Sequence, residues 1–396
     1  MLVSDVEVAG LEFAVTGGDV AGMWSAPDGE RAHFHIGTAR DLWPRIDALR
    51  AELRDQMAIA TGQTPHLRAF TAGWGRAFLP PGLAQRMSDV VVVVPHATTH
   101  DLPIHLIEVA PQQPFGTLAG ITYASSRSLF IRTVERNPAR QRNTGQWHFR
   151  SDARSIEVPV RSVISGGVDV LADLGAEFAA ICRLVVEHFS GERITFLDRG
   201  FPYSRAVAKT GIRRKPGPSV LCVMAHGWVD ADNHRMSGLL VQRDGGGVSA
   251  RSIPLHGGRY FDFRDLPLRS APLEIAAGRD IEVLTAAELE VDGTIGSELV
   301  MLLGCSAGWG RVLQGDEPAS LAETWLKIGA ASVVAPLWDA PIAAVRAWTA
   351  EFLDGWAGRD VPKALAWRDA MRRMHAGDFA DAPERLGVMT LRGDWL

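Results

Sequence analysis

Four short apolar runs, at residues 89–94, 219–225, 298–304 and 331–338, constrain the fold of this chain more than any other feature of its sequence. The runs lack the alternation of apolar and polar residues that marks a half-exposed strand. Strands without a solvent-facing side are typical of mostly parallel sheets that helices cover on both faces. The runs therefore predict a layered α/β fold.

Helical patterns separate these runs. Residues 39–60 and 173–189 carry apolar residues at the three- and four-residue spacing of an amphipathic helix. Ser320 and Glu323 form a capping box for a helix that ends at Gly329. Further helices are expected from residues 341 and 362, short strands at residues 11–15 and 31–36, and an edge strand at residues 386–391. The alternation predicts right-handed crossover connections between the strands.

Composition and charge exclude several classes of protein. The 396 residues are 46% hydrophobic and 22% charged, which supports a folded core and excludes a largely disordered chain. A net charge of -5 gives no basic field for nucleic acid, and the arginine-rich residues 132–154 are interpreted as a solvated loop. No apolar run approaches the roughly 18 residues of a membrane span, and the first residues lack a secretion signal. The 3 cysteines are too few for a disulfide framework, so we expect a cytoplasmic protein.

A histidine and a cysteine follow two of the apolar runs. His226 comes directly after the run at residues 219–225, and Cys305 directly after the run at residues 298–304. In an open α/β sheet the ligand crevice lies beyond the carboxyl ends of the parallel strands. If these two strands are neighbours, the two side chains can face one another. A thiolate beside an imidazole that takes and returns its proton is sufficient for acyl transfer.

Small residues around the pair suit a peptide substrate. Gly227 and Gly304 allow the substrate to approach closely, and the backbone N–H groups of Gly227 and Cys305 are candidates for an oxyanion hole. No carboxylate is evident as a third member, so a backbone carbonyl would orient the imidazole. A histidine and a cysteine at strand ends are more often packing residues, and the pattern alone leaves that alternative open.

Other histidine and cysteine groups favour packing over metal binding. Cys222 and His226 supply only two zinc ligands, and no nearby residues complete a set of four. His96, His100 and His105 are irregularly spaced around a proline, which favours a turn after a buried strand. No GxGxxG or GxxxxGK[ST] motif follows any of the runs, which argues against a nucleotide-binding protein. We expect no metal and no cofactor.

Motifs along the second half of the chain point to a family. They are Ala225-His226-Gly227, Ser237-Gly238-Leu-Leu, Leu284-Thr-Ala-Ala-Glu288-Leu, Leu302-Leu-Gly-Cys305-Ser-Ala-Gly308 with Gly315-Asp316, and Gly329-Ala-Ala-Ser-Val-Val-Ala-Pro-Leu-Trp338. In this order they resemble the CHAT domain, a relative of caspases and separases, and the resemblance extends over nearly the whole chain. It implies a caspase-haemoglobinase-like layered sheet flanked by helices. It also implies a non-catalytic half at residues 1–165 and a catalytic half at residues 166–396.

The resemblance implies a cysteine endopeptidase in which His226 and Cys305 form the dyad. Leu303, Gly304 and Ser306 depart from the family, which commonly has a serine and an alanine before the cysteine and an acidic residue after it. Peptidases that cut after basic residues often have an acid two places before the cysteine. Leu303 stands there instead, so no preference for Arg or Lys is predicted.

The resemblance also implies protein partners. CHAT proteins are frequent in bacterial defence and conflict systems, so we expect a protein substrate and an activating protein or ligand encoded nearby. Activation would come from that partner, or from ordering of the loops at residues 137–155 and 230–264. The residues expected to line a substrate cleft are Asp230, Asp232, Ser306 and Trp338. The alternative is a catalytically silent adaptor that uses the same fold to bind partner proteins.

Overall fold

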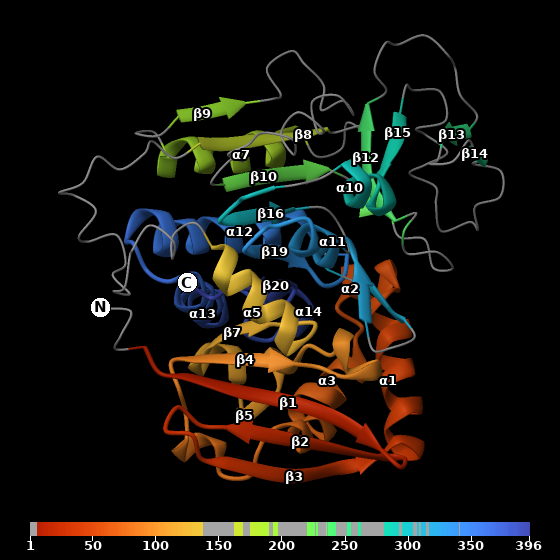
Figure 1. The fold of residues 1–396 in the computed structure, drawn as a ribbon, viewed down its shortest axis with the longest axis vertical. Coiled ribbons are helices and arrows are strands. Elements are labelled where there is room, and N and C mark those ends of the chain that lie inside the picture. The colour runs from red at the N-terminus through yellow and green to blue at the C-terminus, as the bar shows by residue number, and fades with distance from the viewer. Residues whose placement is uncertain are drawn as a thin grey trace.

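The computed structural model describes residues 6–137, 162–168, 175–189, 193–196, 220–225, 227–228, 235, 237–242, 252–254, 260–262, 281–292, 295–303, 307–308, 310–313, 317–339 and 341–396. Across these residues an 11-stranded sheet runs through the molecule (Figure 1). Its strands in spatial order are β3 (Arg31–Thr38), β2 (Asp19–Ser25), β1 (Val8–Thr16), β4 (Val90–Val94), β7 (Gly120–Tyr123), β20 (Met389–Gly393), β19 (Ser332–Pro336), β16 (Leu299–Leu302), β10 (Val220–Ala225), β8 (Ser162–Val168) and β9 (Arg193–Phe196).

The sheet contains two parallel blocks that run in opposite directions. β1, β4, β7 and β20 are parallel to their neighbours in one block, with β2 and β3 added as an antiparallel meander. β19, β16, β10, β8 and β9 form the other block. The blocks meet where β19 pairs antiparallel with β20. The carboxyl ends of the two blocks therefore point to opposite edges of the sheet.

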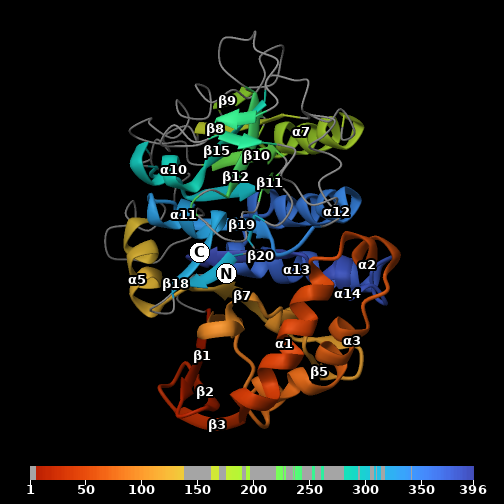
Figure 2. The ribbon, with the colours of Figure 1, turned by 90° about the vertical axis from the view of Figure 1, so that its right-hand side faces the viewer.

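Helices cover both faces of the sheet (Figure 2). One face carries α1 (Ala39–Leu53), α3 (Pro65–Ala72), α7 (Gly175–Phe189), α12 (Ile342–Leu353) and α13 (Lys363–Ala376). The other face carries α5 (Arg127–Arg136), α10 (Ala286–Asp292) and α11 (Leu321–Lys327). Because both faces are covered, the central strands have no solvent side.

The side chains of the central strands alternate between two hydrophobic clusters, one on each face. In β10, Val220 and Cys222 belong to the larger cluster, whereas Leu221 and Val223 belong to the smaller one that includes residues of α10 and α11. Successive residues of a strand point to opposite faces. Both sets of side chains are thus buried, which explains why the sequence of β10 is a continuous apolar run.

Smaller elements complete the described structure. β11 (Gly227–Trp228), β12 (Gly238–Gln242) and β15 (Ile281–Thr285) form a 3-stranded sheet. The two-stranded pairs are β5 (Glu108–Ala110) with β6 (Gln113–Pro114), β13 (Ser252–Pro254) with β14 (Tyr260–Asp262), and β17 (Gly310–Leu313) with β18 (Glu317–Ser320). The short helical elements are α2 (Gln56–Thr61), η2 (Trp74–Phe78), η3 (Leu83–Gln85), η4 (Ala97–Asp101), η5 (Ile104–Leu106), α4 (Phe115–Leu118), η11 (Asp354–Gly358) and α14 (Pro383–Leu386). Within the described part of the chain, no helix has the length and apolar character needed to cross a membrane.

The layered α/β fold predicted from the sequence is confirmed, and the four apolar runs are β4, β10, β16 and β19. One prediction is wrong: the strand expected at an edge lies at the centre of the sheet, as β20 between β7 and β19. The helix expected at residues 39–60 is divided into α1 and α2, because Asp55 caps a new helix by accepting from the N–H groups of Met57 and Ala58. The division of the chain at residue 165 stays a prediction, and β8 crosses that position.

Candidate active site

The two strands that precede the predicted dyad are parallel neighbours. β10 pairs with β16 from Val220↔Leu299 to Val223↔Leu302, so the strands run side by side in the same direction (Figure 1). The N–H of Leu303 donates to the carbonyl oxygen of Val223 at 2.8 Å and continues this pairing beyond β16. The chain therefore leaves both strands at the same edge of the sheet, as the sequence argument requires.

The predicted dyad itself lies outside the described residues. His226, Asp230, Asp232, Cys305 and Ser306 all fall there. The described chain stops at Ala225 at the end of β10 and resumes in β11, where Gly227 pairs with Leu239 of β12. The roles predicted for these residues, and for the backbone N–H groups of Gly227 and Cys305, stay predictions.

The chain on the far side of Cys305 is tied to two neighbouring elements. The carbonyl oxygen of Ala307 accepts from the N–H of Ala322 in α11 at 3.0 Å. The N–H of Gly308 donates to the carbonyl oxygen of Pro336, at the end of β19, at 2.8 Å. A Cβ atom at Gly308 would lie 2.9 Å from that same carbonyl oxygen, so only glycine allows this approach without a shift.

A buried ion pair reaches the same segment from β20. Nη1 of Arg392 donates to Oε1 of Glu323 at 3.0 Å, and the two side chains are 5% and 1% exposed. Nη2 of Arg392 donates to the carbonyl oxygen of Gly308 at 2.9 Å. Sequence reasoning missed Arg392. The available signal was an arginine directly after the strand predicted at residues 386–391, because a charge that becomes buried needs a partner.

Glu323 has a different partner from the one predicted for it. Oγ of Ser320 accepts from the N–H of Glu323 at 3.1 Å, so Ser320 is the N-cap of α11, as predicted. The carboxylate of Glu323 accepts from Arg392. In a capping box it would instead accept from the backbone N–H of the N-cap residue Ser320.

Trp338 was expected to line the substrate cleft. It follows β19, and its indole ring is fully buried, with Nε1 donating to the carbonyl oxygen of Glu384 at 2.9 Å. Such a ring packs in the hydrophobic core. A contact between Trp338 and substrate stays a prediction that substitution can test.

Comparison with known proteins assigns the family. The model of the CHAT domain matches residues 67–385, which is most of the chain. The chain belongs to the CHAT domain family. This match confirms the resemblance seen in the sequence motifs. No curated protein matches the CHAT protein in sequence.

Solved structures resemble the CHAT protein in fold. The separase of the Saccharomyces cerevisiae separase–securin complex is similar over 98% of this chain, with a TM-score of 0.55 and 9% identity, and the chain covers 30% of the separase chain. The Arg-specific cysteine proteinase gingipain R matches over 89% of this chain and 73% of its own, with a TM-score of 0.41 and 12% identity. A complex of pro- and mature domains from Porphyromonas gingivalis matches over 90% and 76%, with a TM-score of 0.43 and 12% identity. The likeness to separase supports the caspase-like fold of the CHAT protein.

The histidines weighed as a metal set do not gather around one point. His105 is fully buried, with Nδ1 2.7 Å from the hydroxyl of Tyr123 and Nε2 2.8 Å from the carbonyl oxygen of Gly387. Burial lowers the pKa of His105 to about 4, although the bond to Gly387 opposes that shift. His96 caps η4, and His100 lies within it. Among the described residues, no three His, Cys, Asp or Glu side chains could hold a metal ion together.

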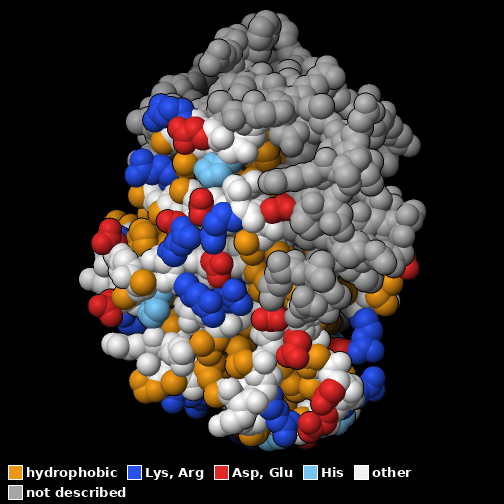
Figure 3. All heavy atoms as spheres, turned by 90° about the vertical axis from the view of Figure 1, so that its left-hand side faces the viewer, with side chains coloured by type: hydrophobic (Ala, Val, Ile, Leu, Met, Phe, Trp, Pro, Cys, Tyr) orange, Lys and Arg blue, Asp and Glu red, His pale blue; other side chains and the backbone are white. Residues whose placement is uncertain are grey.

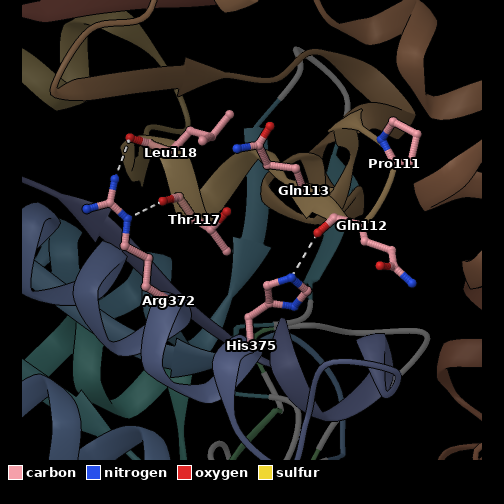
Figure 4. A pocket seen from close by; sticks show the side chains of 7 residues that line it. All are labelled: Pro111, Gln112, Gln113, Thr117, Leu118, Arg372 and His375. Atoms are coloured by element: carbon pink, nitrogen blue, oxygen red, sulfur yellow. Dashed lines mark hydrogen bonds between the residues drawn. The ribbon is translucent and has the colours of Figure 1, made fainter.

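An open hollow of about 580 Å³ lies between α13 and the β5–β6 hairpin (Figure 4). Arg372 and His375 of α13 line it. The guanidinium of Arg372 donates to the main-chain carbonyls of Thr117 and Leu118. Nε2 of His375 lies 2.9 Å from the carbonyl oxygen of Gln112. None of its lining residues belongs to β10, β16 or the segments that follow these strands. The hollow is therefore separate from the candidate active site.

The described surface on the α12 and α13 side interleaves charges of both signs. Figure 3 shows basic and acidic side chains mixed across one face of the CHAT protein. In this region Arg373 pairs with Glu351 and Asp354, and Arg368 pairs with Asp369 at 3.1 Å. Neighbouring charges of opposite sign weaken the long-range field that would attract nucleic acid.

Proposed function

We propose that this CHAT protein is a cysteine endopeptidase with Cys305 as nucleophile and His226 as general base and acid. The observation that carries the proposal is the parallel pairing of β10 with β16. The histidine follows β10 directly and the cysteine follows β16 by three residues, so both leave the sheet at one edge. Parallel strands direct the residues after them toward a shared crevice at their carboxyl ends.

The proposed reaction is acyl transfer. The imidazole of His226 takes the thiol proton of Cys305, the thiolate attacks the carbonyl carbon of the scissile bond, and the proton then goes to the leaving amine. Water hydrolyses the resulting thioester. The N–H groups of Gly227 and Cys305 are the proposed oxyanion donors, a role worth about 3 kcal/mol for each donor in well-studied enzymes. No metal or cofactor takes part.

Control by a protein partner is part of the proposal. The separase that shares this fold was solved in complex with securin. By analogy, a separate protein or ligand encoded nearby would activate the CHAT protein toward a protein substrate, in the cytoplasm and within a bacterial defence system. The proposed division of labour is a non-catalytic half at residues 1–165 and a catalytic half at residues 166–396. The segments 137–155 and 230–264 would gate the site, and Asp230, Asp232 and Ser306 would line its cleft.

Substitution of the nucleophile tests the proposal. Cys305→Ala should abolish cleavage of a peptide library, with and without the proteins encoded beside this one, while the melting temperature stays within a few degrees. Cys222→Ala is the matched control, because Cys222 is buried in β10 and removing its sulfur should leave the cleavage pattern unchanged. Cleavage that survives in Cys305→Ala would refute the assignment.

The alternative is an adaptor that uses the same fold only to bind proteins. It predicts that a small electrophile labels Cys305 no faster than Cys182 and Cys222, because in an adaptor His226 would not act on Cys305 to favour its thiolate. Mass spectrometry of the labelled peptides separates the two functions. Faster labelling of Cys305 that depends on His226 supports the peptidase.

A further inference from the structure

Arg392 uses two different nitrogen atoms to hold two different elements. Nη1 binds the carboxylate of Glu323 in the first turn of α11, and Nη2 binds the main-chain carbonyl of Gly308, three positions after Cys305. The planar guanidinium fixes the angle between its donors. The position of Gly308 is therefore linked to both β20 and α11 through one rigid group.

The ion pair makes this link stiff. Both side chains are almost completely buried, and a buried charge that loses its partner is strongly destabilising. Arg392 therefore cannot leave Glu323 without exposing a bare carboxylate to the core. A hydrogen bond from a charged donor to a carbonyl is also stronger than one from a neutral donor. The carbonyl of Gly308 is thus bound by a guanidinium that the ion pair with Glu323 holds in place.

The residues on both sides of Cys305 have anchors of their own. On the near side, Leu303 is bound to Val223 of β10. On the far side, Ala307 is bound to α11 and Gly308 to the end of β19. Only residues 304–306 lie between these anchors. Arg392 adds a side-chain hydrogen bond to the far anchor, at the carbonyl oxygen of Gly308.

We propose that Arg392 is a positioning residue for Cys305, which sets the place of the sulfur by holding the carbonyl of Gly308 from β20. The proposal rests on the proposed function, since it assigns Arg392 a role in that reaction. A positioning role differs from a purely structural one. Misplacement of a reacting atom by about 1 Å costs about 100-fold in rate, while substrate affinity need not change.

A second ion pair, which is partly buried, gives a control. Arg50 of α1 binds Asp101 of η4 at 2.6 Å, and the side chains are 18% and 4% exposed. This pair also links two elements, but both belong to the first half of the chain, and neither follows β10 or β16. Weakening it should lower stability and leave the reactivity of Cys305 unchanged.

The experiment compares Arg392→Lys with Arg50→Lys. A lysine at position 392 keeps the positive charge beside Glu323, so the chain should still fold, but a single ammonium lacks the fixed fork that reaches Gly308. We expect kcat to fall by about 10- to 100-fold with KM changed less than about 2-fold. We also expect alkylation of Cys305 by iodoacetamide to slow and its dependence on pH to shift. Arg50→Lys should leave kcat, KM and alkylation at the wild-type values.

Further variants separate the possible failures. Gly308→Ala should reproduce the kcat loss, because the added Cβ would push the segment away from Pro336. Wild-type kcat and alkylation in a folded Arg392→Lys protein would overturn the positioning role, even if its melting temperature fell. Equal alkylation of the 3 cysteines in the wild-type chain would instead sink the proposed function itself.

Discussion

Acidification should destabilise this CHAT protein through one buried histidine, His105. Its Nε2 faces the carbonyl oxygen of Gly387, which only accepts, so Nε2 carries the proton. Nδ1 then accepts from the hydroxyl of Tyr123 at 2.7 Å, and the ring is neutral. A second proton would place a charge in a fully buried site and turn Nδ1 into a donor facing that hydroxyl.

The size of the effect follows from the pKa of His105. Burial lowers this pKa from 6.5 to about 4. The unfolded chain therefore binds more protons than the folded one between these two pH values. The contribution of His105 to stability is complete above the unfolded pKa and is lost as the pH falls toward about 4. At about 1.4 kcal/mol for each pKa unit, the loss approaches about 3 kcal/mol.

Chemical denaturation at a series of pH values measures this loss as a change in the free energy of unfolding. His105→Gln removes the titrating group. The fall in the free energy of unfolding between these two pH values should therefore be smaller in the variant than in the wild type by about 3 kcal/mol, whatever the stability of the variant at neutral pH. His35→Gln is the control, because it removes an exposed histidine of β3 and leaves His105 in place. Equal pH dependence in the wild type and in His105→Gln would refute the reasoning.

Three further substitutions test packing, capping and hydrogen bonding in the folded chain. Gly120→Ala should destabilise by about 1–3 kcal/mol, because its Cβ would lie 2.5 Å from the carbonyl oxygen of Ala364; thermal melting checks this. Ser320→Ala should cost about 1 kcal/mol through loss of the α11 cap, measured by denaturant midpoint, and an unchanged midpoint would contradict it. Trp338→Phe leaves the carbonyl of Glu384 without its indole donor and should cost about 1–3 kcal/mol, with peptidase activity kept if the ring only packs.

Features that depend on local sequence could be predicted. β4, β10, β16 and β19 appear as apolar runs because both of their faces are buried. The start and the end of α11 could also be predicted from residues close in sequence, namely the N-cap Ser320 and Gly329, whose φ is +121. The sequence did not show that β10 and β16 are neighbours, and the prediction of a shared site assumed it. In the structure the two strands pair in parallel.

Features that depend on distant partners could not be predicted. A strand was expected at residues 386–391 at an edge of the sheet, whereas β20, with the sequence Met-Thr-Leu-Arg-Gly, lies at its centre. Thr390 and Arg392 are nevertheless buried, since Thr390 binds the carbonyl of Ala335 and Arg392 binds Glu323. These partners are 55 and 69 positions away, and no local pattern identifies them. The histidines near β4 show the same limit, because only the fold places His105 beside Tyr123.

The central place of β20 makes one short segment responsible for joining the two parts of the large sheet. Every other strand of that sheet precedes β20 in the sequence, yet β7 and β19 are joined only through residues 389–393. The two blocks can form separately, but they become one sheet only when this segment inserts between them. Arg392 belongs to the same segment, so the proposed peptidase would gain this support for the cysteine segment only in the folding step that joins the blocks.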